Sequence, residues 1–283
     1  MFFIIGMVIV FASVIFGYVM SHGNLMALWQ PYEYIIICGS AFGAFVVATP
    51  IHVVKRCFAL TPQIIMGSKV DSAMYLDVLG LVYDILNKAR REGFMAIEGD
   101  VENPETSALF SRYPAIQANT ELANFIADYF RIIASGNLTS FELEALMDQE
   151  IEARMHELEA PSLSVSKVAD ALPGFGIVAA VLGIVITMGA IDGEIAEIGA
   201  HVAAALVGTF SGVFLAYGVV GPVGAILQHL AEAEIKMYEA VKSCIVASLN
   251  GLPPQIAVEF GRKSLFTHGR PSFSEVENKV RGR

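Results

Sequence analysis

The 283-residue sequence has few charged residues, and none of them lies inside its four long apolar segments. Charged residues make up 16% of the chain and hydrophobic residues 55%, whereas an ordinary soluble domain is about 25% charged. The apolar segments are Met1–Met20, Tyr34–Val54, Ala171–Ile191 and His201–Leu227. Because a helix needs roughly 20 residues to cross a bilayer, each segment predicts a transmembrane helix.

Lysine and arginine are absent from the two short connections between these segments, Ser21–Pro31 and Asp192–Ala200. All 18 basic residues lie elsewhere in the chain. Because loops rich in Lys and Arg stay in the cytoplasm, the sequence predicts a multi-pass protein of the bacterial inner membrane whose two termini face the cytoplasm.

The fold class that follows is an all-α integral membrane protein with four spans and a helical cytoplasmic domain between the second and third. We expect four parts: a hairpin of spans over 1–54, cytoplasmic helices over 55–170, a second hairpin over 171–227, and a cytoplasmic helix and tail over 228–283. The last helix is expected to reach Leu249, where Gly251 and Pro253–Pro254 stop it before a short polar tail.

Within the cytoplasmic part, apolar residues at three- and four-residue spacing predict helices over Ser72–Arg91 and Thr120–Ala134. Thr139 and Glu142 form a capping-box pattern that opens a further helix through Leu158. The segment Gly93–Pro114, which is interrupted by glycine and proline, is expected to be a loop.

Motifs for chemistry are also absent from the sequence. It contains no Gly-rich loop ending in Gly-Lys-Ser/Thr, no HExxH and no Gly-x-Ser-x-Gly, and its three cysteines lack metal-ligand spacing. We therefore expect no enzyme activity, cofactor or metal. The net charge of −10 argues against binding to nucleic acid. Since Glu33 is expected only at a span entrance, a titrating carboxylate for ion transport would have to come from another chain.

Small and polar residues do occur within the spans. The pairs Gly39/Gly43 and Gly208/Gly212 have the spacing that lets helices approach closely, either within one chain or between copies. Two prolines lie in the second hairpin: Pro173 is expected to open the third span, and Pro222 to create a kink with a free carbonyl near the end of the fourth. Hydroxyl groups on the fourth span are provided by residues that include Thr209 and Tyr217.

Three stretches of the sequence together resemble the MotA family of flagellar stator subunits: Ala89–Glu98, Leu172–Gly183 and Pro253–Lys263. The order of spans, with a large insertion after the second, matches this family over essentially the whole chain. The resemblance implies a homo-oligomeric, pentameric ring around MotB, which would supply a membrane aspartate and a peptidoglycan anchor. Ion flow through this unit would produce torque on the rotor protein FliG.

The resemblance also implies roles for individual residues. Arg90, Glu98 and Glu150 match cytoplasmic charges that face FliG. Pro173 and Pro222 match prolines near the MotB aspartate, and Thr209 and Tyr217 match polar positions of the channel-lining fourth span.

Ala180 stands where sodium-driven relatives carry a hydroxyl, which favours protons as the ion. Two other interpretations stay open at this point: an ExbB- or TolQ-type energy transducer, and a structural membrane scaffold.

Overall fold

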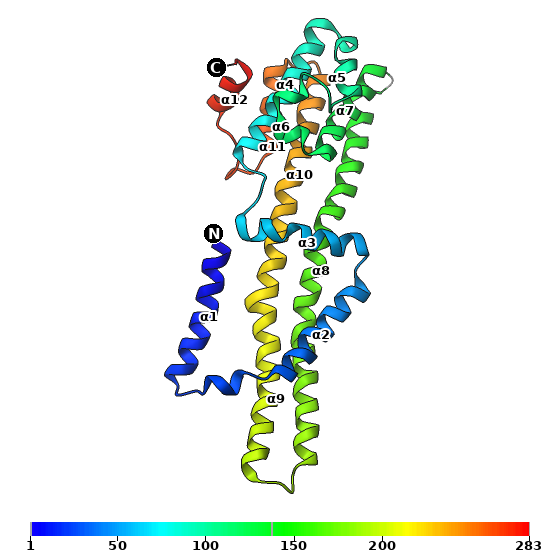
Figure 1. Cartoon of the computed structure of the whole chain (residues 1–283). Helices are drawn as coiled ribbons and strands as arrows, with labels where there is room; N and C mark the ends of the chain where they lie inside the picture. The colour runs from blue at the N-terminus through cyan, green and yellow to red at the C-terminus, as the bar shows by residue number, and fades with distance from the viewer. Residues whose placement is uncertain (1, 137, 283) are drawn as a thin grey trace. The chain divides into compact units, whose positions relative to one another are not determined.

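The computed structural model describes residues 2–136 and 138–282, and no strand occurs among them (Figure 1). The chain divides into two compact units. We call residues 1–67 with 159–229 the span unit, and residues 68–158 with 230–283 the head unit. Each contains helices from two separate parts of the sequence.

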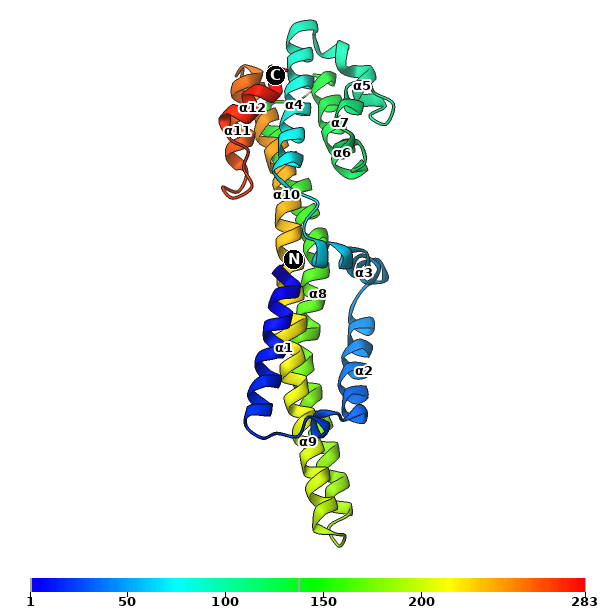
Figure 2. The same ribbon diagram turned by 60° about the vertical axis from the view of Figure 1, so that its left-hand side comes forward.

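Four helical segments are long and apolar enough to cross a membrane, as the apolar runs predict. They begin with α1 (Phe2–Met20) and α2 (Pro31–Ala48), which follows the short 3-10 helix η1 (Leu25–Leu28). The others belong to α8 (Ser140–Gly189) and to the continuous segment formed by α9 (Ile195–Leu215), a π-helical turn (Ala216–Val220) and α10 (Gly221–Leu249). Within the span unit, α8 and α9 run side by side in both views (Figures 1 and 2).

The expected second span is wrong at its C-terminal end. The helix stops at Ala48, and a new helix, α3 (Ile51–Met66), starts after Pro50. Thr49 has the extended conformation (φ −116°, ψ 126°) that a residue before proline prefers, so α2 cannot continue through it. The apolar residues 51–54 therefore belong to a separate helix.

No helix begins at Pro173, and the helix that opens at Thr139 does not end at Leu158. Both belong to α8, a single helix of 50 residues that passes through Pro161 and Pro173. The capping box at its start is present: Thr139 N–H donates to Glu142 Oε2 (2.9 Å), and Glu142 N–H donates to Thr139 Oγ1 (3.3 Å). Each internal proline removes one helical hydrogen bond, but the helix continues on both sides.

The head unit contains the two helices expected from periodicity, α4 (Ser72–Glu92) and α7 (Thr120–Ser135). The segment between them is not a simple loop. It holds η2 (Phe94–Ile97), α5 (Glu98–Glu102), η3 (Phe110–Arg112) and α6 (Pro114–Gln117). Apolar side chains from this segment, including Ile97, Val101 and Phe110, are fully buried in the core of the unit, and this burial folds a segment rich in helix breakers.

The C-terminal region is likewise more ordered than a polar tail. Gly251 (φ +88°) ends α10 as expected, but α11 (Pro254–Ser264) and α12 (Phe273–Val280) follow and contact α4. Val258 and Val276 are buried in the same core. Lys279 also donates to Asp77 on α4 (2.6 Å).

Candidate functional site

The α8–α9 pair is held at backbone contact by glycine. A Cβ added to Gly212 would lie 2.7 Å from the Leu172 carbonyl oxygen and 2.9 Å from the Gly176 Cα. A Cβ on Gly208 would lie 3.2 Å from the Ala179 Cβ. Since real Cβ atoms do not approach backbone as closely as at Gly212, this position needs glycine for the helices to pack as they do, whereas a side chain at Gly208 would be tight against Ala179.

The first glycine pair behaves differently. Gly39 and Gly43 on α2 are exposed, and a Cβ at either position would meet no described atom within 4 Å. Their faces therefore make no close helix contact within the chain. The structure of the single chain therefore gives no support to packing of this pair within the chain.

The structure places three of the predicted channel residues near this contact. Pro173 is next to Leu172, whose carbonyl faces Gly212, and Thr209 is next to Gly208. The backbone N of Ala180 lies 3.5 Å from the position of a Cβ on Gly208. Tyr217 lies further along, in the π-helical turn, and is 70% exposed in the isolated chain.

Pro222 follows a π-helical turn, Ala216–Val220. Gly221 N–H donates to the carbonyl of Ala216, five residues before it. Because Pro222 has no N–H, the carbonyl of Gly218, four residues before it, loses its α-helical donor. Single π-helical turns of this kind are frequent at functional sites. The sequence identified the proline, but not the form of the irregularity.

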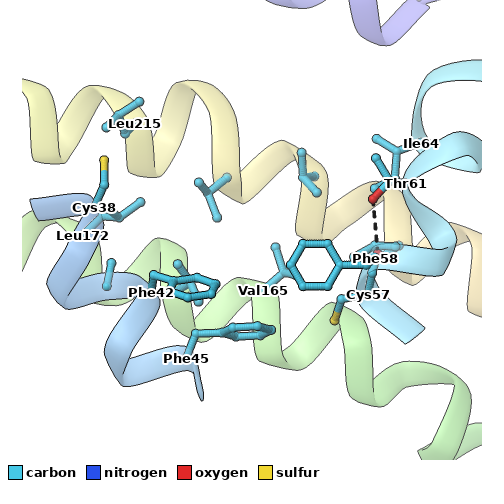
Figure 3. A pocket seen from close by; sticks show the side chains of 15 residues that line it. Cys38, Phe42, Phe45, Cys57, Phe58, Thr61, Ile64, Val165, Leu172 and Leu215 are labelled. Atoms are coloured by element: carbon cyan, nitrogen blue, oxygen red, sulfur yellow. Dashed lines mark hydrogen bonds between the residues drawn. The ribbon is translucent and has the colours of Figure 1, made fainter. Parts of the chain in front are cut away.

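An apolar cavity of about 360 Å³ lies in the span unit among α2, α3, α8 and the α9–α10 segment (Figure 3). Phe42, Phe45 and Phe58 project into it, and the Thr61 hydroxyl is turned to the carbonyl of Cys57 (3.5 Å). This lining offers almost no ligand for an ion, so the cavity is not suited to be an ion path. No group of three or more His, Cys, Asp or Glu that could hold a metal is found in residues 2–136 and 138–282.

Arg90 and Glu98 lie on the two sides of a turn in the head unit. Arg90 is in the last turn of α4, Gly93 (φ +88°) ends that helix, and Glu98 opens α5. Both charged side chains are exposed, and within the described part of the chain neither takes part in a salt bridge. They are therefore available to an external partner.

Asp100 stabilises the turn that carries Arg90 and Glu98. Its carboxylate accepts hydrogen bonds from Lys88 Nζ (2.7 Å) and Ser107 Oγ (2.6 Å), which ties α5 to α4. Burial disfavours the charged form of Asp100, but the hydrogen bonds from Lys88 and Ser107 and the lysine charge outweigh it, so the pKa of this carboxyl lies below its ordinary value.

We expect Asp100→Asn to loosen this turn. A partly exposed ion pair contributes up to ~1 kcal/mol, so hydrogen exchange over residues 93–107 of the full chain should speed up about fivefold at pH 7. Since the folded pKa is lowered, the stabilisation is complete above the ordinary pKa of about 3.9 and is lost as the pH falls through the folded value. The difference between variant and wild type should therefore disappear in acid.

Asp148→Asn is the matched control, because Asp148 pairs with Lys242 elsewhere in the head unit. Hydrogen–deuterium exchange with mass spectrometry would measure both variants. Equal exchange of residues 93–107 in Asp100→Asn and wild type at pH 7 would show that Asp100 does not stabilise the turn.

Glu150 has a partner within the chain. Tyr129, which is 2% exposed, donates its hydroxyl to Glu150 Oε2 (2.7 Å). Burial, followed by the contact with Glu150, raises the pKa of Tyr129. Glu150 thus accepts the hydrogen bond of a buried hydroxyl in the head unit. The sequence did not indicate this structural contact, because Glu150 lies among other acidic residues of a helix.

The burial of Glu33 was not expected from the sequence. It lies in the first turn of α2, as expected of an entrance, but it is only 9% exposed. Glu33, Ile37 and Ala41 form the buried stripe of α2, at four-residue spacing. That spacing was visible in the sequence, and with Pro31 as a helix start it could have indicated that Glu33 faces inward.

Comparisons with known proteins agree on one family. Residues 4–93 match the motility protein A N-terminal family, and residues 117–240 match the MotA/TolQ/ExbB proton channel family. Motility protein A of Salmonella typhimurium is 44% identical over 99% of this chain and 95% of its own length. Chemotaxis protein LafT of Vibrio parahaemolyticus is 40% identical over 96% of each chain.

Solved structures share the fold. The structure of C. jejuni MotAB superposes with a TM-score of 0.76 at 19% identity, covering 95% of this chain and 98% of that one. The flagellar MotAB stator complex from Bacillus subtilis gives a TM-score of 0.71 at 21% identity, with 97% of each chain covered. With 44% identity to a motility protein A over nearly its whole length, the chain belongs to the motility protein A family, the stator subunits of the flagellar motor.

Proposed function

We propose that this chain forms the ring of a flagellar stator unit in the inner membrane, with its termini, residues 55–170 and residues 228–283 in the cytoplasm. Residues 1–48 and 171–227 would supply the two hairpins of spans. The distribution of Lys and Arg supports this topology, because Ser21–Pro31 and Asp192–Ala200 contain neither. The break at Thr49–Pro50 places Lys55 and Arg56 on α3, just beyond the second span.

The partner of this ring would be MotB, which would supply the membrane aspartate and the peptidoglycan anchor. The observation that carries this proposal is the α8–α9 contact, whose residues 171–189 and 202–215 contain no Asp, Glu, Lys or Arg. Because this tightly packed pair of helices has no ionisable group of its own, it could form the surface against which a carboxylate of another chain lies. Gly39 and Gly43, whose Cβ positions have no described atom within 4 Å, would pack between copies of the ring, which we take to be pentameric.

The transported ion would be a proton. Ala180 provides no side-chain oxygen beside Gly208, which removes one of the several oxygen ligands that a dehydrated sodium ion needs. A proton needs only a carboxylate and a chain of water and hydroxyl groups, to which Thr209 and Tyr217 would contribute. Pro173 and Pro222 would let the two helices respond when the MotB carboxylate changes its charge.

Torque would pass to FliG through Arg90 and Glu98. Both are exposed, and neither has an ion-pair partner in the described part of the chain. Exposed ion pairs contribute only ~0–1 kcal/mol each, which suits an interface that must form and break at every step.

The test is complementation of a strain that lacks this gene and any second stator gene. The wild-type gene should restore rotation to paralysed filaments. Arg90→Ala or Glu98→Ala alone should slow swimming modestly, because each removes one weak contact, and the double variant should slow it more than either single variant.

Membrane levels of all variants, measured by immunoblot, serve as the control. Asp148→Ala, which removes a charge with its own partner Lys242, should swim normally. Paralysis that persists with the wild-type gene would refute the stator function, and normal swimming of the double variant would refute the rotor contact.

A further inference from the structure

A buried carboxylate of the chain's own lies against the channel hairpin. Glu33 Oε2 has no hydrogen-bond partner, and it lies 3.0 Å from the position of a Cβ on Gly208, next to Thr209. The side chain therefore fills the space that the missing Gly208 side chain leaves between α2, α8 and α9. A second orphan polar atom, Ser211 Oγ, lies on the same face of α9 one turn further on, in a side chain that is 2% exposed.

No charged group faces Glu33 from the elements packed around it. Residues 171–189 of α8 and Leu25–Leu28 of η1 contain no titratable side chain. On α9 the nearest are His201 and Glu197, which pair with each other (3.9 Å) and precede Gly208 by seven and eleven residues, or ~10 and ~16 Å along the helix. On α2, the Tyr34 hydroxyl donates to the Leu28 carbonyl (3.1 Å), and Tyr32 is exposed.

Two opposing effects act on such a group. An unpaired charge buried between helices costs several kcal/mol, so the closed α2–α8–α9 contact suits the neutral acid. The unpaired N–H groups at the start of α2 favour the anion, and Glu33 lies in that first turn. Either form is therefore within reach, and a small opening of the contact to water would select the anion.

We propose that Glu33 is a proton-binding site of this chain, which loads protons on the outer side of the channel hairpin before they reach the carboxylate of the partner. The step is a simple transfer: an O–H bond of hydronium breaks, an O–H bond forms at Glu33 Oε2, and water is released. On unloading, the proton passes to water beside the hydroxyls of Thr209 and Ser211. The loading role rests on the proposed function, whereas proton binding is a property of this chain alone.

Infrared difference spectroscopy on the purified full-length protein in lipid bilayers tests proton binding directly. Wild type should show a carbonyl band of a protonated carboxylic acid that titrates with bulk pH, and Glu33→Gln should lack it. Glu33→Asp should retain a band at a shifted pH, because a carboxyl remains. Glu197→Gln, which removes an exposed outer carboxylate, should keep the wild-type band. An unchanged band in Glu33→Gln would overturn the proposal.

Rotation measured against load tests the loading role. Glu33→Gln has nearly the same size and polarity as glutamate, so a merely structural role predicts wild-type speed at every load. Slow proton loading instead predicts that speed falls several-fold at low load, where ion transit limits rotation, and little near stall. Speed equal to wild type at low load would overturn the loading role.

These tests are separable from the proposed function. If the wild-type gene fails to restore rotation while the infrared band of Glu33 is present, the stator assignment fails and proton binding stands. If rotation is restored and Glu33→Gln behaves as wild type in both measurements, only the inference about Glu33 fails.

Discussion

Pro222→Leu is expected to abolish rotation while leaving the chain at least as stable as wild type. Leucine at this position supplies the N–H that the carbonyl of Gly218 lacks, so the π-helical turn Ala216–Val220 can return to α-helical hydrogen bonding. A π-helical turn holds one residue more than an α-helical turn. Its return to α-helix therefore rotates the residues before the turn by about 100° relative to those after it. Thr209 and Tyr217 would then no longer present the same faces to the partner.

The substitution should change stability and rotation in opposite directions. Replacing an internal helix proline by leucine removes a cost of ~3 kcal/mol, so stability alone predicts an improved protein. Function is measured as swimming speed and as proton conductance on co-expression with MotB lacking its plug, and stability as the melting temperature in lipid. Swimming at wild-type speed would show that the π-helical turn has no part in coupling.

Pro62→Leu is the matched control. Pro62 is also a proline inside a helix, but it lies on the exposed side of α3, outside the α8–α9 hairpin. It should gain similar helix stability and swim normally. Paralysis of Pro62→Leu would indicate that straightening any helix of the span unit stops the motor.

Gly212→Val is expected to disrupt the span unit. A Cβ here would lie 2.7 Å from the carbonyl oxygen of Leu172 and 2.9 Å from the Cα of Gly176, and both are backbone atoms that cannot rotate away. Overpacking of this kind costs typically ~1–3 kcal/mol, so the melting temperature should fall by several degrees and rotation should be lost.

Gly39→Val separates packing from helix propensity. Valine is a better helix former than glycine at both positions, by a few tenths of a kcal/mol, so propensity alone predicts stabilisation of both variants. Gly39 has no described atom within 4 Å of its Cβ position, and its variant should therefore melt at or slightly above the wild-type temperature in the isolated chain. Equal melting of Gly212→Val and wild type would refute the close contact of α8 with α9.

Much of the fold follows from local patterns in the sequence. Hydropathy and length identify the four apolar helices, because each is long enough to cross a bilayer and has side chains apolar enough to lie in one. Periodicity predicts α4 and α7, and Thr139 with Glu142 fixes the start of α8. In each case the deciding interaction lies within a few residues along the chain.

The errors occur where contacts distant in sequence outweigh local preference. Proline and glycine suggested a loop before Pro114, a helix start at Pro173 and a polar tail after Pro254, yet helices occupy these regions. Burial of side chains such as Phe110 and Val276 in the head-unit core offsets the local cost of the breakers. Only at Thr49–Pro50, where α2 meets α3, did proline end a helix that hydropathy would have continued.

For the functional site, the sequence by itself determined which residue types are available: charge-free spans, the glycine pairs, two prolines, and the charged residues Arg90 and Glu98. The tertiary structure decided which of them meet. It placed Gly208 and Gly212 in backbone contact, left Gly39 and Gly43 free, and enclosed Glu33 between α2 and the hairpin. The physical reason is that a sequence records the composition of a helix face, whereas burial and pairing depend on which other face it packs against.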